Sequence, residues 1–240
     1  MGRSRLTRSA PRRSHVAVPR RKTRPFPIER ALETLERFAR TLQVPVVTLA
    51  AEVSRDPFEV LVACLLSLRT KDGTTAVAVK KLFARAKTPK ALLGIPEREL
   101  ADLIYPVGFY RTKARVLREV ARTILNDLGG SVPDTLEGLL ELRGVGRKTA
   151  NLVITQAFQR PGICVDTHVH RIMNRFGFVR TKTPDETELA LRARLPVRFW
   201  IPVNPTLVAF GQGVCGPISP RCSACPVDEL CPKVGVTHRR

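Results

Sequence analysis

The sequence predicts an all-α protein, and two observations support this fold class. Apolar residues recur at spacings of three and four along most of the chain, which is the period of one face of an amphipathic helix. Residues 27–42 show the pattern clearly, with an apolar stripe of Ile28, Leu32, Leu35, Phe38 and Leu42. No stretch sustains the alternation of apolar and polar residues that predicts a half-buried strand. We therefore expect helices nearly throughout the chain after residue 26.

The next two helices are predicted from their caps and their apolar patterns. Residues 56–70 are apolar almost all round, which indicates a buried helix with Asp56 as its cap and Pro57 in its first turn. Residues 71–86 have an amphipathic pattern, for which Asp72 is the expected cap.

Three further helices are expected between residues 96 and 142. Residues 96–109 and 111–130 are helical in pattern, and the second segment ends on a glycine pair that favours a helix stop. Residues 132–142 contain Asp134 and Glu137 at the spacing of a capping box. This short helix leads into a turn that contains glycine.

The chain carries a large excess of positive charge. Its 240 residues include 41 Lys and Arg against 21 Asp and Glu, a net charge of +20. Such a surface attracts a polyanion or an anionic membrane, and no apolar run approaches the roughly 18 residues that a membrane-spanning helix needs. Most of the basic residues are arginines, which bind phosphate with two parallel hydrogen bonds. Nucleic acid is therefore the favoured partner, and no membrane association is expected.

Part of this charge lies in an N-terminal segment. Residues 1–25 carry nine Arg or Lys and no acidic residue, and they show no helical periodicity. We interpret residues 1–27 as a basic disordered tail. Three roles are open for it: an arm that grips DNA, a targeting peptide, or a solubilising extension.

Residues 141–153 (ELRGVGRKTANLV) place a glycine-rich turn between two apolar helical faces, which predicts a helix-hairpin-helix. Gly144 and Gly146 permit positive φ and close backbone approach. Their N–H groups form an anion site with the N-terminus of the following helix, so the motif grips phosphate without reading bases. An ordinary helical corner is the alternative, and the net charge disfavours it.

Lys148 lies in the first turn of the second hairpin helix and admits two roles. The simpler role is a phosphate contact. The other is a nucleophile that attacks the C1′ carbon of a damaged nucleotide, expels the base and leaves a Schiff base with the sugar. Partial burial and the positive end of a helix both favour the neutral, nucleophilic amine. Asp166 is expected to cap a later helix, and it is also suited to accept the lysine proton and stabilise positive charge on the sugar.

Four cysteines near the C-terminus form the strongest motif. Cys215, Cys222, Cys225 and Cys231 have the spacing C-x6-C-x2-C-x5-C. Without a secretory signal disulfides are disfavoured, and four thiolates fit either zinc or an iron–sulfur cluster. The spacing alone leaves the metal open. A second metal site at Cys164, His168 and His170 is disfavoured, because its spacing fits no standard site.

Together these features resemble the endonuclease III family of helix-hairpin-helix DNA glycosylases and AP lyases. The matching segments are LSLRTKD, VGFYRTKA, LRGVGRKTANLV and VDTHVHRIMNR, together with the four-cysteine spacing. The resemblance covers roughly residues 28–232. It implies two all-helical domains with DNA in the cleft between them: residues 51–160 as a six-helix domain with the hairpin, and residues 28–50 and 161–240 as an iron–sulfur cluster domain.

The resemblance also implies a reaction. The expected enzyme is a base-excision-repair DNA glycosylase with AP lyase activity that removes oxidised pyrimidines and cuts 3′ to the abasic site by β-elimination. Lys148 would be the Schiff-base nucleophile, Asp166 its catalytic partner, and the four cysteines would hold a 4Fe-4S cluster. A monovalent cation at the hairpin carbonyls near Leu142 and Val145 is also implied. The partner is double-stranded DNA with damaged pyrimidines or abasic sites, and a monomer is expected.

The resemblance further implies a set of DNA contacts. These are Arg69, Phe109, Arg143, Gly144, Val145, Gly146, Arg147, His168 and Arg221. Phe109 is expected as an apolar wedge in the gap left by a flipped base, and Arg69 is expected to approach that gap from the opposite side.

Three of these positions depart from the family pattern. Arg69 stands where the family commonly has Gln, and Arg143 replaces a Pro at the start of the hairpin. The loop CGPISPRC has only Arg221 where relatives often have several basic residues. The first departure bears on the choice of lesion and the third on the grip on DNA.

Other classes of protein compete with this interpretation. One is a catalytically weak or inactive helix-hairpin-helix DNA-binding protein with a structural cluster. Another is an iron–sulfur electron carrier, which the net charge disfavours. Adenine- and thymine-mismatch glycosylases generally lack the hairpin lysine, so Lys148 disfavours them. The expected location is the cytoplasm (nucleoid) of a bacterium, with organellar or nuclear targeting by the basic tail left open.

Overall fold

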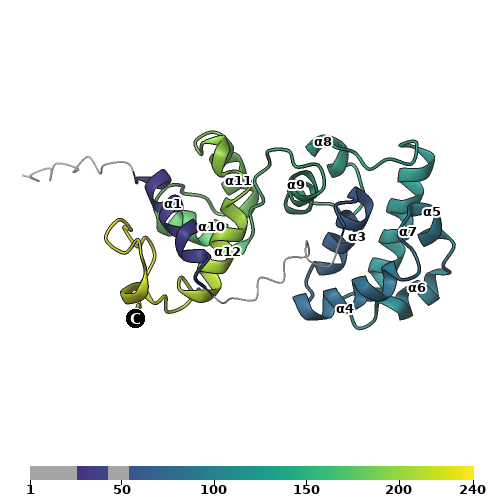
Figure 1. Ribbon diagram of the computed structural model, residues 1–240, viewed down its shortest axis with the longest axis horizontal. Coiled ribbons are helices and arrows are strands. Elements are labelled where there is room, and N and C mark those ends of the chain that lie inside the picture. The colour runs from purple at the N-terminus through teal and green to yellow at the C-terminus, as the bar shows by residue number, and fades with distance from the viewer. Residues whose placement is uncertain (1–25, 43–53) are drawn as a thin grey trace, which may run out of the picture.

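The computed structural model describes residues 26–42 and 54–240, and the regular structure of these ranges is helical, with no strand among them. Figure 1 shows two groups of helices along the long axis of the molecule, α3 to α9 at one end and α1 with α10 to α12 at the other. The predicted all-α fold class is confirmed. None of the helices in the described ranges is long and apolar enough to cross a membrane. The predictions for the basic tail before residue 26 and for residues 43–53 lie outside the described residues.

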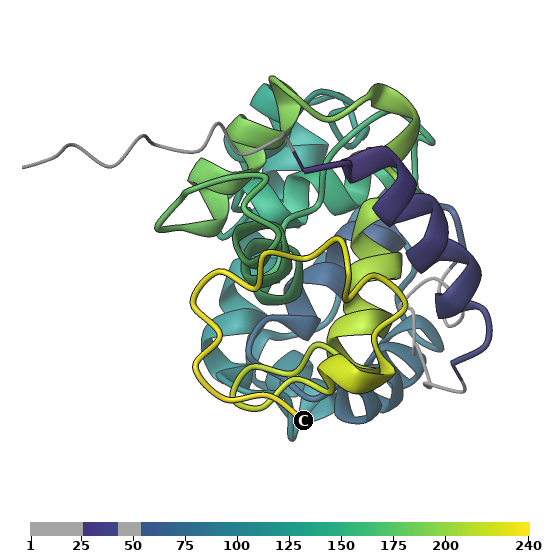
Figure 2. The ribbon, with the colours of Figure 1, turned by 90° about the vertical axis from the view of Figure 1, so that its left-hand side faces the viewer.

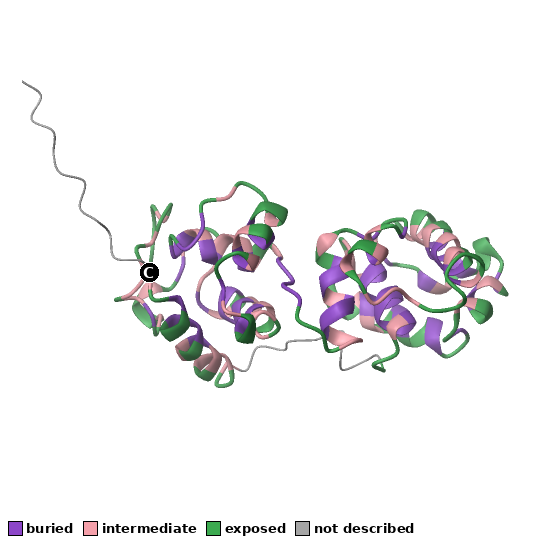
Figure 3. Ribbon diagram, turned by 90° about the horizontal axis from the view of Figure 1, so that it is seen from above, coloured by how far each residue is buried: buried purple, intermediate pink, exposed green. Residues whose placement is uncertain are grey.

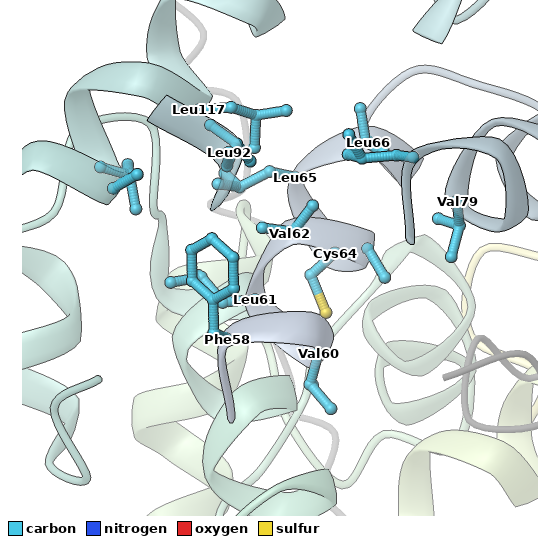
Figure 4. Close-up of a cluster of buried hydrophobic side chains, with 14 of the residues drawn as sticks. Phe58, Val60, Leu61, Val62, Cys64, Leu65, Leu66, Val79, Leu92 and Leu117 are labelled. Carbon is cyan, nitrogen blue, oxygen red and sulfur yellow. The ribbon is translucent and has the colours of Figure 1, made fainter. Parts of the chain in front are cut away.

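The first group of helices surrounds a helix that is buried on nearly every side. In α3 (Pro57–Ser67), every residue from Phe58 to Leu66 is buried. Figure 4 shows these side chains packed against others from the rest of the group, among them Val79, Leu92 and Leu117. A helix without a polar face must be enclosed by its neighbours, and the prediction of a buried helix here is confirmed.

Six further helices complete this group. They are α4 (Asp72–Phe83), α5 (Pro89–Leu93), α6 (Glu97–Ile104), α7 (Tyr110–Asn126), α8 (Leu136–Leu140) and α9 (Arg147–Gln156). The sequence analysis predicts all of them except α5, a helix of five residues. The described part of this group therefore holds seven helices, one more than the six that the resemblance implies.

Two predicted helix ends are confirmed. Oδ1 of Asp56 accepts the N–H groups of Phe58 and Glu59 at 2.9 and 3.1 Å, which caps α3. After α7, Gly130 adopts a φ of +85° and its N–H bonds the carbonyl of Ile124 at 2.8 Å, which ends that helix.

Two other predicted caps are wrong. α4 starts at Asp72 itself, with Lys71 before it and no side-chain cap; the carboxylate instead sits inside the first turn, where the helix dipole favours it. Thr135, not Asp134, caps α8, through a 3.2 Å hydrogen bond from the N–H of Gly138. The carboxylate of Asp134 pairs with Arg160 at 2.7 Å, a partner that only the folded chain brings near.

The second group joins the N-terminal helix to the C-terminal third of the chain. Its helices are α1 (Ile28–Ala39), α10 (Thr167–Arg175), α11 (Pro184–Arg192), α12 (Val203–Gly213) and the short 3-10 helices η1 (Val197–Phe199) and η2 (Cys222–Ala224). Ile28, Leu32 and Leu35 of the predicted stripe are buried in its core. Figure 2 shows α1 beside α12, with the irregular C-terminal segment in front of them.

The buried apolar residues form two separate clusters, and Figure 3 shows buried stretches within each group of helices. Between α9 and α10, the last residue of the first cluster is Ile154 and the next residue of the second cluster is Ile163. The division into a domain of residues 51–160 and a domain of residues 28–50 and 161–240 remains a proposal, and the two clusters support it.

Leu61 is fully buried at the centre of α3, so we expect Leu61→Ala to lower the free energy of unfolding by about 2–5 kcal/mol through the lost contacts and the cavity left behind. Val77→Ala is the control, because Val77 is 53% exposed on α4 and should change stability by roughly 0.5 kcal/mol or less. Urea unfolding measures both. Equal effects would show that α3 is not the centre of the core.

Candidate active site

The hairpin between α8 and α9 presents backbone N–H groups that no side chain caps. Leu142 and Val145 are buried and anchor the turn, whereas Gly144 and Gly146 are exposed. Gly144 has a φ of +80°, and a Cβ there would lie 3.1 Å from Val116, so the turn suits glycine. Gly146 is the N-cap of α9 and supplies no side chain. The first N–H groups of α9 are therefore available to an anion.

Lys148 is the second residue of α9. Its side chain is exposed rather than partly buried, which differs from the expectation. In the free protein Lys148 therefore stands at the solvent-exposed, N-terminal end of α9.

Asp166 is the N-cap of α10, as predicted. Its Oδ1 accepts the N–H groups of His168 and Val169, both at 2.9 Å. These two bonds fix the carboxylate but use only one of its oxygens. Oδ2 accepts no hydrogen bond from the described residues, so it is available as a proton acceptor.

Lys148 and Asp166 line the same cleft between the two groups of helices. The cleft has a volume of about 670 Å³, and residues of α4, α9, α10, α11 and α12 form its walls. Leu152 and Ile201 give it apolar surface. Two residues predicted from separate segments of the sequence, one from each group of helices, thus share one cavity.

His168 is half-buried in the wall of this cleft. Burial lowers the pKa of His168; Asp166 raises it, while Arg171 and Lys148 lower it further. In the neutral ring, Nδ1 accepts a hydrogen bond from Arg171 at 3.1 Å. The ring also packs tightly on Gly211 of α12, where a Cβ would lie 2.4 Å from Nδ1. A neutral, fixed ring suits contact with a base or sugar better than an ion pair with phosphate.

A buried ion-pair network around Glu188 joins the two groups of helices. Glu188 lies in α11, and its side chain is 2% exposed. Its Oε2 pairs with Arg147, the first residue of α9, and its Oε1 pairs with Arg192. A buried charge is tolerated when it is paired and hydrogen-bonded. Glu188 therefore ties the helix of Lys148 to the other group of helices.

Asn151 extends this network to the segment that leads into α10. Its Oδ1 accepts hydrogen bonds from Arg192 at 2.8 Å and from the N–H of Ile163 at 3.1 Å. Its side-chain amide donates to the carbonyl of Arg147 at 3.0 Å. The start of α9 is thus fixed relative to the chain before α10. The sequence singles out none of the partners of Arg147, because polar residues on an amphipathic helix are usually solvated.

Arg69 and Phe109 lie together at the tips of two loops. Phe109 is 63% exposed, so it is not a core residue. The guanidinium carbon of Arg69 lies 5.8 Å from the centroid of the Phe109 ring, within cation–π range. The two side chains are therefore adjacent to each other, whereas the sequence analysis expects them on opposite sides of a gap.

The other arginines predicted to contact DNA differ in exposure and in the protein groups that their side chains contact. Arg143 is 59% exposed and pairs with Glu119 at 2.6 Å. Arg221 is exposed and donates to the carbonyl of Gly213, the last residue of α12. The guanidinium of Arg147 is held by Glu188, so its backbone N–H is the group that remains for a phosphate.

The four C-terminal cysteines line one pocket. Cys215, Cys222, Cys225 and Cys231 are free thiols around it. Phe176 and Phe210 supply apolar walls, and the guanidinium of Arg175 lies 3.2 Å from the sulfur of Cys215. Arg175 also donates to the carbonyls of Gly216 and Pro217 at 2.7 and 2.6 Å, which shapes the loop between the first two cysteines.

The donor set of this pocket is four thiols, a set that binds either zinc or an iron–sulfur cluster. Among the described residues, no group of three or more His, Cys, Asp or Glu side chains is arranged to hold a metal ion. A structural zinc site would hold four sulfurs about 2.3 Å from a single ion. An iron–sulfur cluster is likewise held by cysteine thiolates, so four thiols around one pocket suit either group.

The network around Glu188 predicts a large effect of a small substitution. Glu188→Gln keeps the shape of the side chain but leaves two arginines without their carboxylate, so we expect a loss of about 3–5 kcal/mol in the free energy of unfolding. Glu99→Gln is the matched control, because the Arg85–Glu99 pair is about half exposed and should contribute about 0–1 kcal/mol. Denaturant unfolding measures the free energy of unfolding of both variants. Equal losses of stability would contradict a buried network that joins the two groups of helices.

Comparison with known proteins assigns the chain to a family. Residues 62–196 match the family described as HhH-GPD superfamily base excision DNA repair protein. Endonuclease III of Thermotoga maritima is 48% identical over 176 residues, which cover 73% of this chain and 83% of that relative.

Solved structures agree with this assignment. A trapped endonuclease III–DNA covalent intermediate, an estranged-adenine complex, matches with a TM-score of 0.76 at 34% identity, over 86% of this chain and 94% of that one. A thermostable thymine-DNA glycosylase matches with a TM-score of 0.74 at 28% identity, over 85% and 95% of the two chains. The resemblance drawn from the sequence is confirmed: the chain belongs to the endonuclease III family, within the HhH-GPD superfamily of base excision DNA repair proteins.

Proposed function

We propose that the cleft binds double-stranded DNA with a damaged pyrimidine or an abasic site, and that Lys148 is the nucleophile. Membership of the family establishes the class of enzyme, a base-excision-repair DNA glycosylase with AP lyase activity. One observation carries the residue assignment: Lys148 stands at the uncapped N-terminus of α9 and lines the cleft that Asp166 also lines. That a related protein has been trapped in a covalent intermediate with DNA supports covalent chemistry in this chain.

The hairpin supplies the grip on DNA. A phosphate bound at the N–H groups of the first turn of α9 interacts favourably with the helix dipole. The exposed glycines Gly144 and Gly146 let the DNA backbone approach closely, and Arg143 adds a positive charge beside them. The target nucleotide then leaves the stack, which costs a few kcal/mol.

The chemistry follows from the groups in the cleft. The amine of Lys148 attacks C1′, the bond from C1′ to the base breaks, and the base leaves with the bonding electrons. Asp166 takes the proton that the amine loses, and its charge stabilises the positive charge that develops on the sugar. Opening of the sugar ring leaves a Schiff base between Lys148 and C1′. Loss of a C2′ proton then breaks the bond between C3′ and its oxygen, which cuts the strand 3′ to the abasic site, and water releases the enzyme.

A 4Fe-4S cluster is the proposed occupant of the cysteine pocket. The four free thiols, the apolar walls and the guanidinium of Arg175 fit such a group, because thiolates hold iron–sulfur clusters and nearby donors compensate their negative charge. When bound, the cluster would shape the C-terminal segment, and no step of the reaction passes through it. A monovalent cation at the hairpin carbonyls near Leu142 and Val145 also remains a proposal.

The state and location of the protein are proposals as well. We infer a monomer, because one chain supplies both walls of the cleft and both candidate catalytic residues. For a bacterial protein the proposed location is the cytoplasm, at the nucleoid, where its DNA substrate lies.

Borohydride trapping on a duplex with one abasic site tests the reaction. The wild-type protein should form a covalent adduct, and Lys148→Ala should lose it while retaining DNA binding. Asp166→Asn should slow single-turnover cleavage by about 10²-fold or more, the usual range for a missing proton acceptor. Lys90→Ala, an exposed lysine on α5, is the charge-matched control and should trap normally.

Two outcomes would contradict these roles. Trapping by Lys148→Ala at the wild-type level would remove it as the nucleophile, and normal turnover by Asp166→Asn would reduce that residue to a helix cap. Wild-type protein that binds the duplex without any adduct would favour the second candidate, an inactive DNA-binding protein.

Metal analysis tests the cluster. Protein expressed with ample iron should be brown and contain iron and acid-labile sulfide in equal amounts. Cys222→Ser should lower the iron content and loosen the C-terminal segment, because cluster binding is coupled to folding. Cys64→Ala is the control, since Cys64 is buried in α3, within the other core, and should leave the iron content unchanged. Stoichiometric zinc in place of iron would contradict the proposal.

Phe109 is proposed as the wedge that holds the gap open after the base leaves the stack. Its 63% exposure supports this role, because a residue that anchors a turn would be buried. Phe109→Ala should slow excision from a damaged pair about tenfold more than cleavage at a preformed abasic site, where little unstacking remains. Single-turnover rates on the two duplexes measure the difference. Equal losses with a lower melting temperature would mark Phe109 as a structural residue.

A further inference from the structure

The side chain of Lys113 joins the two loops that carry Arg69 and Phe109. Lys113 lies in the first turn of α7, and its ammonium group reaches the end of α3. It donates to the carbonyls of Leu66 and Leu68 at 2.7 and 2.6 Å, and to the hydroxyl of Thr70 at 3.1 Å. An ammonium group has three protons, so every donor of Lys113 is used.

Thr70 links Lys113 to the second loop, the one that carries Phe109. Its hydroxyl also accepts the N–H of Gly108 at 3.1 Å. The two loops approach so closely that a Cβ on Gly108 would lie 2.6 Å from the carbonyl oxygen of Arg69. Only glycine fits there, and the residue that follows it is Phe109.

Both loop tips are strained. Arg69 has a φ of +53° and Phe109 a φ of +59°, in the left-handed region that is unfavourable for a residue with a side chain. Such conformations persist when the surrounding contacts determine them. At these two tips, the contacts are the hydrogen bonds of Lys113 and Thr70, together with the packing of Gly108.

The position of Lys113 has its own cost, which its contacts offset. The side chain is half-buried, and burial lowers its pKa to about 8. The ammonium group also faces the C-terminal carbonyls of α3, where the helix dipole favours a cation. A lysine that only solubilised the surface would not be held in this way.

We propose that Lys113 is a positioning residue that holds Arg69 and Phe109 as one preassembled unit for the gap that an extruded base leaves. This inference rests on the proposed function of the cleft. Arg69 and Phe109 are already ordered before DNA binds, so no binding energy is needed to order them while the base leaves the stack. That energy is then available for unstacking. Lys113 itself makes no contact with the reacting atoms, and its effect should reach the reaction only through the two loop tips.

The test compares two substrates in single-turnover reactions: a duplex with one oxidised pyrimidine, and the same duplex with a preformed abasic site. Lys113→Met keeps the length of the side chain and removes its donors. We expect excision of the oxidised base to slow at least tenfold, the equivalent of about one charged hydrogen bond, and cleavage at the abasic site to change about twofold or less. Lys90→Met, which removes an exposed charge from α5, should alter neither rate. Equal losses on both substrates would overturn the proposal.

A double-variant comparison separates positioning from general stability. If Lys113 acts through the loop tips, Lys113→Met should add about twofold or less to the defect of a variant that already carries Arg69→Ala and Phe109→Ala. A purely structural role would multiply the defects, and that result would also overturn the proposal. If Lys113→Met fails to fold, Thr70→Val interrupts the same connection more mildly, and it should show the same selective loss on the oxidised base.

These outcomes can be told apart from failure of the proposed function. Wild-type protein that cuts neither duplex would contradict the function itself, before any variant is compared. Wild-type activity on both duplexes with no selective loss in Lys113→Met or Thr70→Val would leave the function standing and remove Lys113 from it.

Discussion

The candidate chemistry depends on a buried carboxylate, that of Glu188, which is not among the residues that line the cleft of Lys148 and Asp166. Lys148 belongs to one group of helices and Asp166 to the other, so the proposed reaction requires that the two groups keep a fixed relative position. Glu188 provides this constraint by pairing with Arg147, the residue directly before Lys148. Apolar contacts between helices permit small sliding movements, whereas separating this pair would leave a charge buried without a partner. The width of the cleft is therefore held by electrostatics as well as by shape.

Three groups in the first turn of α9 serve different tasks. They do not interfere, because helical geometry points them in different directions. Successive residues on a helix point about 100° apart. Arg147 can therefore point to Glu188 while Lys148 faces the cleft, and the N–H groups of the same turn remain available to a phosphate. Asp166 divides its tasks in a similar way: Oδ1 caps α10 and Oδ2 is left for the proton. At the start of α9 and at Asp166, a structural contact fixes the position of a proposed reactive group and leaves that group free for the reaction.

Local sequence signals predicted the features that depend on neighbouring residues. The burial of α3, the caps at Asp56 and Asp166, and the stop after α7 all follow from patterns within a few positions. The side-chain contacts that were missed around the site depend on partners far along the chain: Glu188 is 41 residues from Arg147, and Lys113 is 47 residues from the carbonyl of Leu66. Backbone carbonyls carry no sequence signature, and a charged residue on a helix has the same appearance whether it faces water or a buried partner. The roles proposed for Lys148 and Asp166 also came from combining motifs, because neither residue is distinctive alone.

Arg69 stands where the family commonly has Gln, and its contact with Phe109 gives this departure a second consequence. Considered as separate residues, Arg69 would alter only the contact with the base opposite the lesion. In the structure its guanidinium lies against the Phe109 ring, and the two loops are joined by Thr70 and Lys113. A glutamine, which is common at this position in the family, carries no charge to attract the face of the ring. If Phe109 is the wedge, as proposed, the arginine should affect the position of the wedge as well as the recognition of the opposing base. Its donors can bond acceptors such as those that guanine presents, but the guanidinium can accept none in return. On this proposal, lesion choice in this chain should be a property of Arg69 and Phe109 together, because the two side chains are in contact.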